Sequence, residues 1–232
     1  MQNKMKAIIF DLDGTLLDTL QDLHAAVNFA LHSHGMPERT IDEVRQFVGN
    51  GVRRLMELAV PEGEKNPEFE AAFADFKAYY AEHNIDFTKP YDGILDTLKA
   101  LKEKGFRMAI VSNKLEEATE ALRQHFFADY IETAVGDAPE RLRKPAPDGV
   151  FEAMHRLGVT KEECVYVGDS DVDYRTAINA GLPCISVLWG FRSRKELESL
   201  GATLKGSRAA GESEALTVFC EKPEDLQKQF VF

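Results

Sequence analysis

The hydrophobic pattern of the chain changes character twice along its length. Residues 7–10, Ala-Ile-Ile-Phe, form an uninterrupted apolar run, which is typical of a strand covered on both faces in a parallel sheet. From about residue 17 to residue 88 the apolar residues recur at helical spacing, and no convincing strand interrupts them. Residues 40–43, Thr-Ile-Asp-Glu, match a capping box, and Asn66-Pro67 is typical of a helix start. This pattern predicts an all-helical insertion at residues 17–88.

After residue 91 strands and helices alternate. The strand-like runs occupy residues 106–111, 131–135, 164–167 and 184–188. A helical stretch before the first of these runs ends near residue 105, and the helical stretches between the others cover residues 115–122, 148–157 and 174–179. Such alternation predicts βαβ units with right-handed crossovers. The predicted fold class is therefore α/β, with a Rossmann-like open parallel sheet flanked by helices in residues 1–16 and 89–232. Residues 203–216 are rich in Gly, Ser and Ala without periodicity, and they predict a surface loop.

Composition narrows the possible partners and the compartment. The formal net charge is −11, with 28 basic and 39 acidic residues, which argues against a nucleic-acid or anionic-membrane partner. Hydrophobic residues make up 44% of the chain, enough for a folded core. Cys164, Cys184 and Cys220 have spacings that fit neither a zinc site nor a disulfide framework, so free thiols in a reducing compartment are expected. No apolar run approaches the roughly 18 residues of a membrane span. We expect a soluble, cytoplasmic protein.

Four short polar segments follow predicted strands or lie in Pro-marked turns. They are residues 11–15 (Asp-Leu-Asp-Gly-Thr), 112–113 (Ser-Asn), 144–145 (Lys-Pro) and 168–173 (Gly-Asp-Ser-Asp-Val-Asp). Ligands of open parallel sheets bind beyond the carboxyl ends of the strands, so these segments are expected to meet at one edge. Each segment alone has an ordinary explanation, such as a turn or an acidic helix N-terminus. All four in this order indicate a phosphate-handling metal site.

The carboxylates of these segments suit phosphoryl transfer. Asp11 at a strand end can attack phosphorus if a divalent cation screens the charge of the phosphate. Mg²⁺ prefers a few carboxylate oxygens plus waters, and Asp169 and Asp173 can supply the remaining protein contacts. Asp13 can protonate the leaving oxygen and later activate water against an aspartyl-phosphate.

The remaining residues of the segments suit phosphate binding. Backbone N–H groups near Leu12 and Asp13 can face the phosphate if the chain turns there. Ser112 can donate its hydroxyl and Asn113 its backbone N–H to phosphate oxygens. Lys144 adds the positive charge that a crowded acidic site requires.

These residues and their order resemble the haloacid dehalogenase superfamily of phosphohydrolases, whose motifs are an Asp-x-Asp, a Ser/Thr, a Lys and an acidic cluster. The resemblance extends over nearly the whole chain, and it implies that residues 17–88 form a helical cap domain. It also implies that Asp11 is the nucleophile and Asp13 the general acid/base. The implied Mg²⁺ ligands are Asp11, the backbone carbonyl of Asp13 and Asp169, with Asp173 acting through a water or in the second shell. The implied phosphate binders are Ser112 and Lys144.

Within the superfamily, residues 47–54 and 111–114 are most similar to the phosphoglycolate phosphatase group. This resemblance implies a Mg²⁺-dependent phosphatase that hydrolyses a small phosphorylated metabolite through an aspartyl-phosphate, with 2-phosphoglycolate the favoured substrate. The alternatives are an inorganic pyrophosphatase, a broad sugar-phosphate or nucleotide phosphatase, and a non-catalytic module that binds phosphometabolites. The presence of both Asp11 and Asp13 counts against the last. The oligomeric state is left open between monomer and homodimer.

The helical insertion is expected to determine substrate specificity. Backbone N–H groups of the Gly49-Asn50-Gly51 loop can meet a small carboxylate. Arg53 or Arg54 can pair with the same group. The alternative for both arginines is a solvated helix face.

Overall fold

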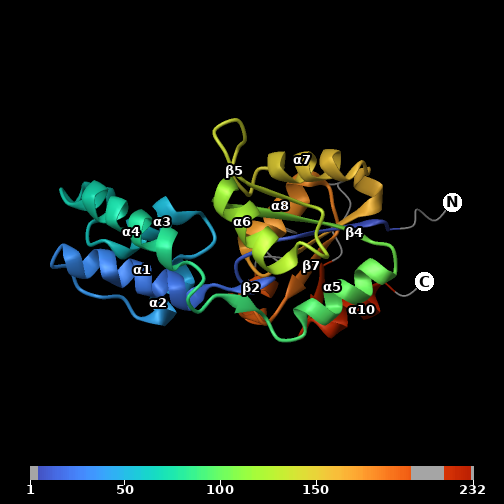
Figure 1. Cartoon of the computed structure of the whole chain (residues 1–232), viewed down its shortest axis with the longest axis horizontal. Coiled ribbons are helices and arrows are strands. Elements are labelled where there is room, and N and C mark those ends of the chain that lie inside the picture. The colour runs from blue at the N-terminus through green and yellow to red at the C-terminus, as the bar shows by residue number, and fades with distance from the viewer. Residues whose placement is uncertain (1–4, 200–216, 231–232) are drawn as a thin grey trace. The chain divides into compact units, whose positions relative to one another are not determined.

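The computed structural model describes residues 5–199 and 217–230 of the chain (Figure 1). The chain divides into two compact units, which we call the sheet unit (Met1–Leu16 with Pro90–Phe232) and the helical unit (Leu17–Lys89). The loop predicted at residues 203–216 lies outside the described residues.

The sheet unit contains six parallel strands in the order β5-β4-β1-β6-β7-β8. Their bounds are β1 Ala7–Phe10, β4 Arg107–Leu115, β5 Thr133–Asp137, β6 Cys164–Gly168, β7 Cys184–Val187 and β8 Thr217–Cys220. All four residues of β1 are buried, and this strand pairs with β4 on one side and β6 on the other. A strand in the middle of a covered parallel sheet is apolar throughout, which explains its sequence. The predicted α/β fold is confirmed.

Helices cover both faces of this sheet. They are α5 Ile94–Glu103, α6 Glu116–Phe127, α7 Asp148–Leu157, α8 Asp171–Ala180 and α10 Glu224–Gln229, with a 3₁₀ turn η2 at Lys161–Glu163. The apolar faces of α7 and α8 bury residues such as Val150 and Ala177 against Ile9 and Tyr166 of the strands. In Figure 1, α7 lies above the sheet, and α5 with α10 lies below it. The short η2 turn carries the capping box that Thr160 predicted.

Several elements differ from their predicted bounds, and two of these differences, in β4 and α8, affect the site segments. The strand predicted at residues 106–111 continues as β4 to Leu115, and its register with β5 shifts between Val111 and Leu115. The helix predicted to start at Tyr174 begins at Asp171, because the Ser170 hydroxyl accepts from the Asp173 backbone N–H and forms a capping box. The acidic segment is therefore the first turn of α8. The sequence analysis had not identified α10.

The helical unit contains α1 Leu20–Ser33, α2 Ile41–Phe47, α3 Val52–Ala59 and α4 Phe69–His83, with a 3₁₀ turn η1 at Gly63–Lys65. The capping box predicted at Thr40 is present at the start of α2. Buried Asp22 of α1 accepts from the backbone N–H groups of Phe87 and Thr88, at 3.0 and 2.8 Å, so it holds the segment that leaves the unit. One small sheet departs from the helical pattern: β2 Leu17–Asp18 pairs with β3 Lys89–Pro90.

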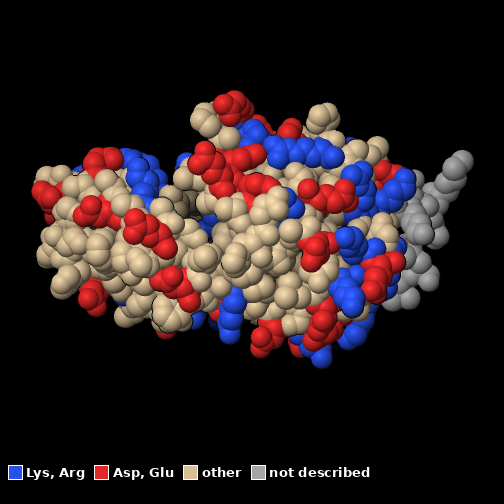
Figure 2. Space-filling model, viewed as in Figure 1, with Lys and Arg blue, Asp and Glu red and all other residues tan. Residues whose placement is uncertain are grey.

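The surface and the cysteines agree with the composition. Acidic and basic side chains are interspersed on the face of the sheet unit drawn in Figure 2. Cys164, Cys184 and Cys220 are buried free thiols, as predicted. Among the helices of residues 5–199 and 217–230, none has the length and apolar character to cross a membrane.

Candidate active site

Asp11 follows β1 directly, so its carboxylate lies at the carboxyl edge of the sheet. Its backbone N–H donates to the Val167 carbonyl of β6 at 2.9 Å. The chain then turns tightly, and the Leu16 N–H donates to the Leu12 carbonyl at 3.0 Å. Gly14 within this turn has a φ of 86°, a left-handed conformation that side chains rarely adopt. The first motif is therefore folded back at the end of the central strand.

Two glycines leave space for the carboxylate of Asp169. A Cβ on Gly14 would lie 2.5 Å from Asp169 Oδ2, and a Cβ on Gly190 would lie 2.4 Å from Asp169 Cβ. Oδ2 accepts from the Phe191 N–H at 2.6 Å, and Oδ1 accepts from the Thr15 hydroxyl at 3.3 Å. Backbone from two distant segments can thus approach Asp169 only because those positions carry no side chain.

Ser112 and Asn113 lie near the end of β4, beside β1. The Ser112 side chain is buried, and its Oγ accepts from the Lys114 N–H at 3.2 Å. The Asn113 side-chain amide holds the backbone of Lys144 at two points. Its Nδ2 donates to the Lys144 carbonyl at 3.1 Å, and its Oδ1 accepts from the Lys144 N–H at 2.8 Å. Asn113 therefore fixes the lysine segment with its side chain, a role that the sequence analysis missed.

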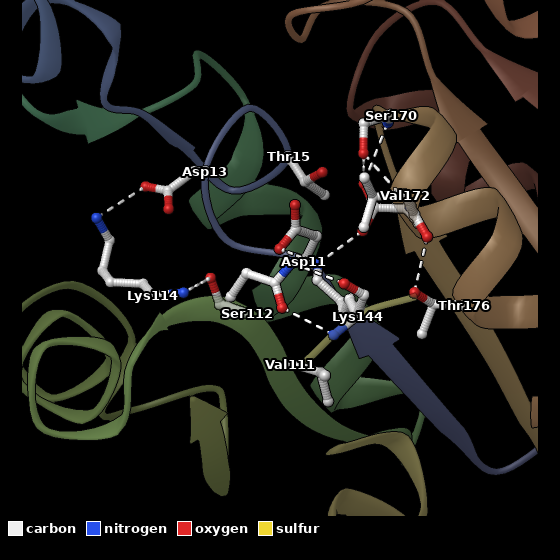
Figure 3. Close-up of polar contacts among 12 residues, drawn as sticks. Asp11, Asp13, Thr15, Val111, Ser112, Lys114, Lys144, Ser170, Val172 and Thr176 are labelled. Carbon is white, nitrogen blue, oxygen red and sulfur yellow. Dashed lines mark hydrogen bonds and ion pairs between the residues drawn. The ribbon is translucent and has the colours of Figure 1, made fainter. Parts of the chain in front are cut away.

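The Lys144 ammonium bridges two of the predicted carboxylates. Its Nζ lies 2.7 Å from Asp11 Oδ1, 2.7 Å from Asp173 Oδ1 and 3.2 Å from the Tyr166 hydroxyl. Figure 3 shows Lys144 and Asp11 together at the centre of the site. Burial alone lowers the pKa of Lys144, but the carboxylates of Asp11 and Asp173 raise it well above its ordinary value. Lys144 is therefore a fixed cation.

Three buried carboxylates meet beside this lysine. Oxygen atoms of Asp11, Asp169 and Asp173 all lie within 4.8 Å of one another. Burial, helped by the neighbouring Asp173, raises the pKa of Asp169 to about 7, and burial also raises the pKa of Asp11 well above its ordinary value. Three carboxylates beside one ammonium give the site an excess of negative charge when all three are ionised. A compact all-oxygen donor set with surplus negative charge fits a hard divalent cation such as Mg²⁺.

Asp13 belongs to the same loop as Asp11, but its carboxylate has a different neighbour. Asp13 Oδ1 lies 3.4 Å from the Lys114 Nζ, and both side chains are largely buried. The contact is an ion pair and not a hydrogen bond, since Asp13 Oδ1 has no hydrogen-bond partner. In Figure 3 this pair lies on the side of Asp11 away from Ser170.

The predicted specificity residues belong to the helical unit. Gly49, Asn50 and Gly51 connect α2 to α3, and the two glycines have φ values of 126° and 81°. Gly51 is the N-cap residue of α3. The loop is therefore built on backbone conformations that favour glycine at both positions.

Both predicted arginines pair with carboxylates of their own unit. Arg53 lies 2.7 Å from Glu64 and 2.6 Å from Glu70, and its guanidinium stacks on Phe69. Arg54 lies 2.6 Å from Glu57. All these pairs are solvent-exposed, and exposed pairs contribute only about 0–1 kcal/mol. Substrate binding by either arginine stays a prediction. A substrate carboxylate would have to compete with Glu57, Glu64 or Glu70 for the guanidinium group.

Tyr166 is a site residue that sequence reasoning missed. It is fully buried on β6, and its hydroxyl contacts Lys144 Nζ at 3.2 Å and Asp173 Oδ1 at 3.1 Å. A tyrosine in the apolar run Cys-Val-Tyr-Val was the available signal, because a buried hydroxyl needs a partner. Tyr166 is a positioning residue, since it holds two of the charged groups in place.

We expect Tyr166→Phe to lower kcat by roughly three- to tenfold, because a hydrogen bond to a charged group contributes about 1.5–3 kcal/mol and only part of this reaches the transition state. Steady-state kinetics and thermal melting measure the effect. The matched control is Tyr174→Phe, a buried tyrosine of the same apolar cluster that lies on α8. Equal kcat losses in the two variants would show that the network around Lys144 does not need the Tyr166 hydroxyl.

Comparisons with known proteins agree with this site. The sequence profile of the haloacid dehalogenase-like hydrolase family matches residues 8–187. The phosphoglycolate phosphatase of Aquifex aeolicus is 36% identical over 188 residues, 81% of this chain and 86% of the relative. Phosphoglycolate phosphatase 1 of Pseudomonas aeruginosa is 35% identical over 205 residues, 86% of this chain and 75% of the relative. A crystal structure from Lactobacillus delbrueckii subsp. bulgaricus, 34% identical, superposes with a TM-score of 0.86 over 98% of this chain and 99% of its own. The chain belongs to the haloacid dehalogenase-like hydrolase family.

Proposed function

We propose that the chain is a Mg²⁺-dependent phosphatase that hydrolyses a small phosphomonoester, with 2-phosphoglycolate as the preferred substrate. The observation that carries this proposal is the buried cluster of Asp11, Asp169 and Asp173 around the Lys144 ammonium. The names of the relatives support the substrate, since several related proteins at 32–36% identity are phosphoglycolate phosphatases. We also propose a cytoplasmic location, which the three free thiols support.

The proposed reaction has two steps at one phosphorus atom. The Asp11 carboxylate attacks phosphorus and forms an aspartyl-phosphate, while the ester bond to the leaving oxygen breaks and Asp13 protonates that oxygen. In the second step Asp13 takes a proton from water, the water oxygen bonds to phosphorus, and the bond to Asp11 breaks. Asp11 is regenerated and inorganic phosphate leaves.

The remaining residues bind the phosphate and the metal. Lys144, the Ser112 hydroxyl and backbone N–H groups near Leu12, Asp13 and Asn113 hold phosphate oxygens during both steps. Mg²⁺ would be held by Asp11, the Asp13 backbone carbonyl and Asp169, and Asp173 would act through a water or by orienting the direct ligands. When bound, the cation neutralises charge so that an anionic nucleophile can approach an anionic phosphate.

The helical unit is proposed to act as the cap. The predicted cap, residues 17–88, lies within the helical unit Leu17–Lys89. Its Gly49-Asn50-Gly51 loop and Arg53 or Arg54 are proposed to contact the substrate carboxylate. A small substrate offers few contacts, so we propose that the enzyme discriminates between substrates by closure of the cap, which excludes water.

A substrate screen tests this function. We expect kcat/KM to be highest for 2-phosphoglycolate among pyrophosphate, hexose phosphates and nucleoside monophosphates, and we expect activity to vanish in chelator. A preference for pyrophosphate or for sugar phosphates would identify one of the alternative phosphatases. Tight binding of phosphometabolites without turnover would identify a non-catalytic module.

Mg²⁺ binding is expected to weaken as the pH falls below about 7, because burial raises the pKa of Asp169 to about 7 and protons then compete with the cation. The folded-state pKa lies above the ordinary value of 3.8, so proton binding favours the folded, metal-free protein. Its stability should therefore fall as pH rises between these two values, and Mg²⁺ should offset the loss. Melting temperatures with and without Mg²⁺, at about pH 5.5 and about pH 8, measure this. If Mg²⁺ raises the melting temperature equally at both pH values, Asp169 does not control Mg²⁺ binding. The same conclusion follows if Mg²⁺ raises the melting temperature of Asp169→Asn as much as that of the wild type.

A further inference from the structure

Lys114 is a buried cation that the mechanism above does not use. It lies on β4, two residues after Ser112, and its side chain is only 5% exposed. Its Nζ lies 3.4 Å from Asp13 Oδ1. Burying an ammonium is costly unless anions lie near it, and Asp13 is one such anion beside Lys114.

The two buried lysines of the site serve different regions. Lys144 lies between Asp11 and Asp173, at 2.7 Å from each, on the side of the nucleophile and the metal ligands. Lys114 lies beside Asp13, on the other side of Asp11 in Figure 3. The first cation therefore accompanies the reacting phosphate, and the second accompanies the general acid.

The position of the general acid defines where the leaving group lies. Asp13 must come within about 2.6–3.2 Å of the leaving oxygen to protonate it. Atoms attached to that oxygen are then held beside Asp13, where Lys114 is 3.4 Å away. In phosphoglycolate the carboxylate carbon is separated from the leaving oxygen by a single methylene. A substrate carboxylate at that distance is within reach of the Lys114 ammonium, whereas the Asp13 contact is longer than the roughly 2.7–2.9 Å of a charge-assisted hydrogen bond.

We propose that Lys114 binds the anionic group of the leaving alcohol, and that it makes the sheet unit itself selective for phosphomonoesters with a carboxylate close to the ester oxygen. The proposal rests on the proposed function, because it needs Asp13 to act on the leaving oxygen. It assigns a specificity-determining residue outside the helical unit. The selected substrate class is small 2-phosphorylated carboxylic acids, and neutral alkyl or aryl phosphates are outside it.

The test compares two substrates in the intact enzyme. We expect Lys114→Met to lower kcat/KM for 2-phosphoglycolate by about 10- to 100-fold, the range for a lost hydrogen bond between charged groups. For n-propyl phosphate, whose leaving alcohol is neutral but needs the same proton from Asp13, the expected change is less than about threefold. Lys114→Arg keeps the charge and should retain most of the selectivity. Lys161→Met, an exposed lysine of η2, is the matched control and should change neither substrate.

The outcomes separate this proposal from the proposed function. Equal losses on both substrates in Lys114→Met would show that the lysine only positions Asp13, and they would overturn the proposal. A wild-type enzyme that hydrolyses n-propyl phosphate but not 2-phosphoglycolate would contradict the proposed substrate instead. If Lys114→Met does not fold, as judged by circular dichroism, Lys114→Gln and Lys114→Arg give the same comparison, and loss of selectivity in Gln but not in Arg supports the proposal.

Discussion

Asp11→Asn is expected to reduce turnover by roughly 10³-fold or more and to leave the melting temperature nearly unchanged. The amide has almost the same size as the carboxylate, but it is a poor nucleophile and a poor metal ligand. Burial already raises the pKa of Asp11 well above its ordinary value, which means that the charged carboxylate is costly to bury. Removing this charge therefore does not destabilise the fold. Turnover of phosphoglycolate and p-nitrophenyl phosphate, together with thermal melting, measures both effects.

The matched variant is Asp13→Asn, which changes the neighbouring carboxylate of the same loop. It should still allow slow phosphorylation of Asp11 but should block hydrolysis of the intermediate, so intact-protein mass spectrometry should detect a phosphorylated chain. Asp11→Asn should show no such adduct. Turnover above a few per cent of wild type in a contaminant-free preparation of Asp11→Asn would rule out the covalent mechanism.

Lys144→Met is expected to have the largest combined effect on activity and stability. The Lys144 ammonium lies 2.7 Å from Asp11 and 2.7 Å from Asp173. Its removal leaves both buried carboxylates without this compensating charge. Breaking a buried ion pair in this way costs about 3–5 kcal/mol of unfolding free energy. We expect kcat to fall by about 10²- to 10³-fold, since a preorganised charge on the phosphate is also lost.

The stability loss in Lys144→Met has a predictable pH dependence. The pKa of Asp11 is already raised by burial, and without the lysine it should rise further, so protonation increasingly favours the folded state as the pH falls. The deficit relative to wild type should therefore be smaller at about pH 5 than at about pH 8. Urea denaturation at both pH values measures it, with Lys144→Arg as the variant that keeps the charge. A deficit that is constant with pH would mean that lost packing, and not uncompensated charge, destabilises the variant.

The sequence was sufficient for the α/β fold and the family because each depends on local patterns. Strands buried on both faces must be apolar throughout, and this made β1 and β6 recognisable. Sequence reasoning set the start of α8 at Tyr174 because it favoured the motif over the alternative of an acidic helix N-terminus, whereas Ser170 and Asp173 form the capping box of this helix.

The missed features of the site depend on contacts between distant segments. The Asn113 amide meets the backbone of Lys144, and the Tyr166 hydroxyl meets Lys144 and Asp173 across the strands. No local pattern shows such partners, because the β-propensity of a residue does not indicate whether its side chain packs in the core or faces the site. Arg53 illustrates the same limit, because its partner Glu70 belongs to another helix.

The two glycines around Asp169 bear on how such an enzyme can change its substrate during evolution. Even a methyl group on Gly14 or Gly190 would collide with the Asp169 side chain, so selection should hold these positions constant whatever the substrate is. Lys114 lies on the other side of Asp11, beside Asp13. A single codon change at Lys114 can alter both the charge and the length of its side chain. New activities in a lineage descended from this enzyme should therefore first appear as substitutions beside the proposed leaving-group position, while Gly14 and Gly190 behind Asp169 stay unchanged.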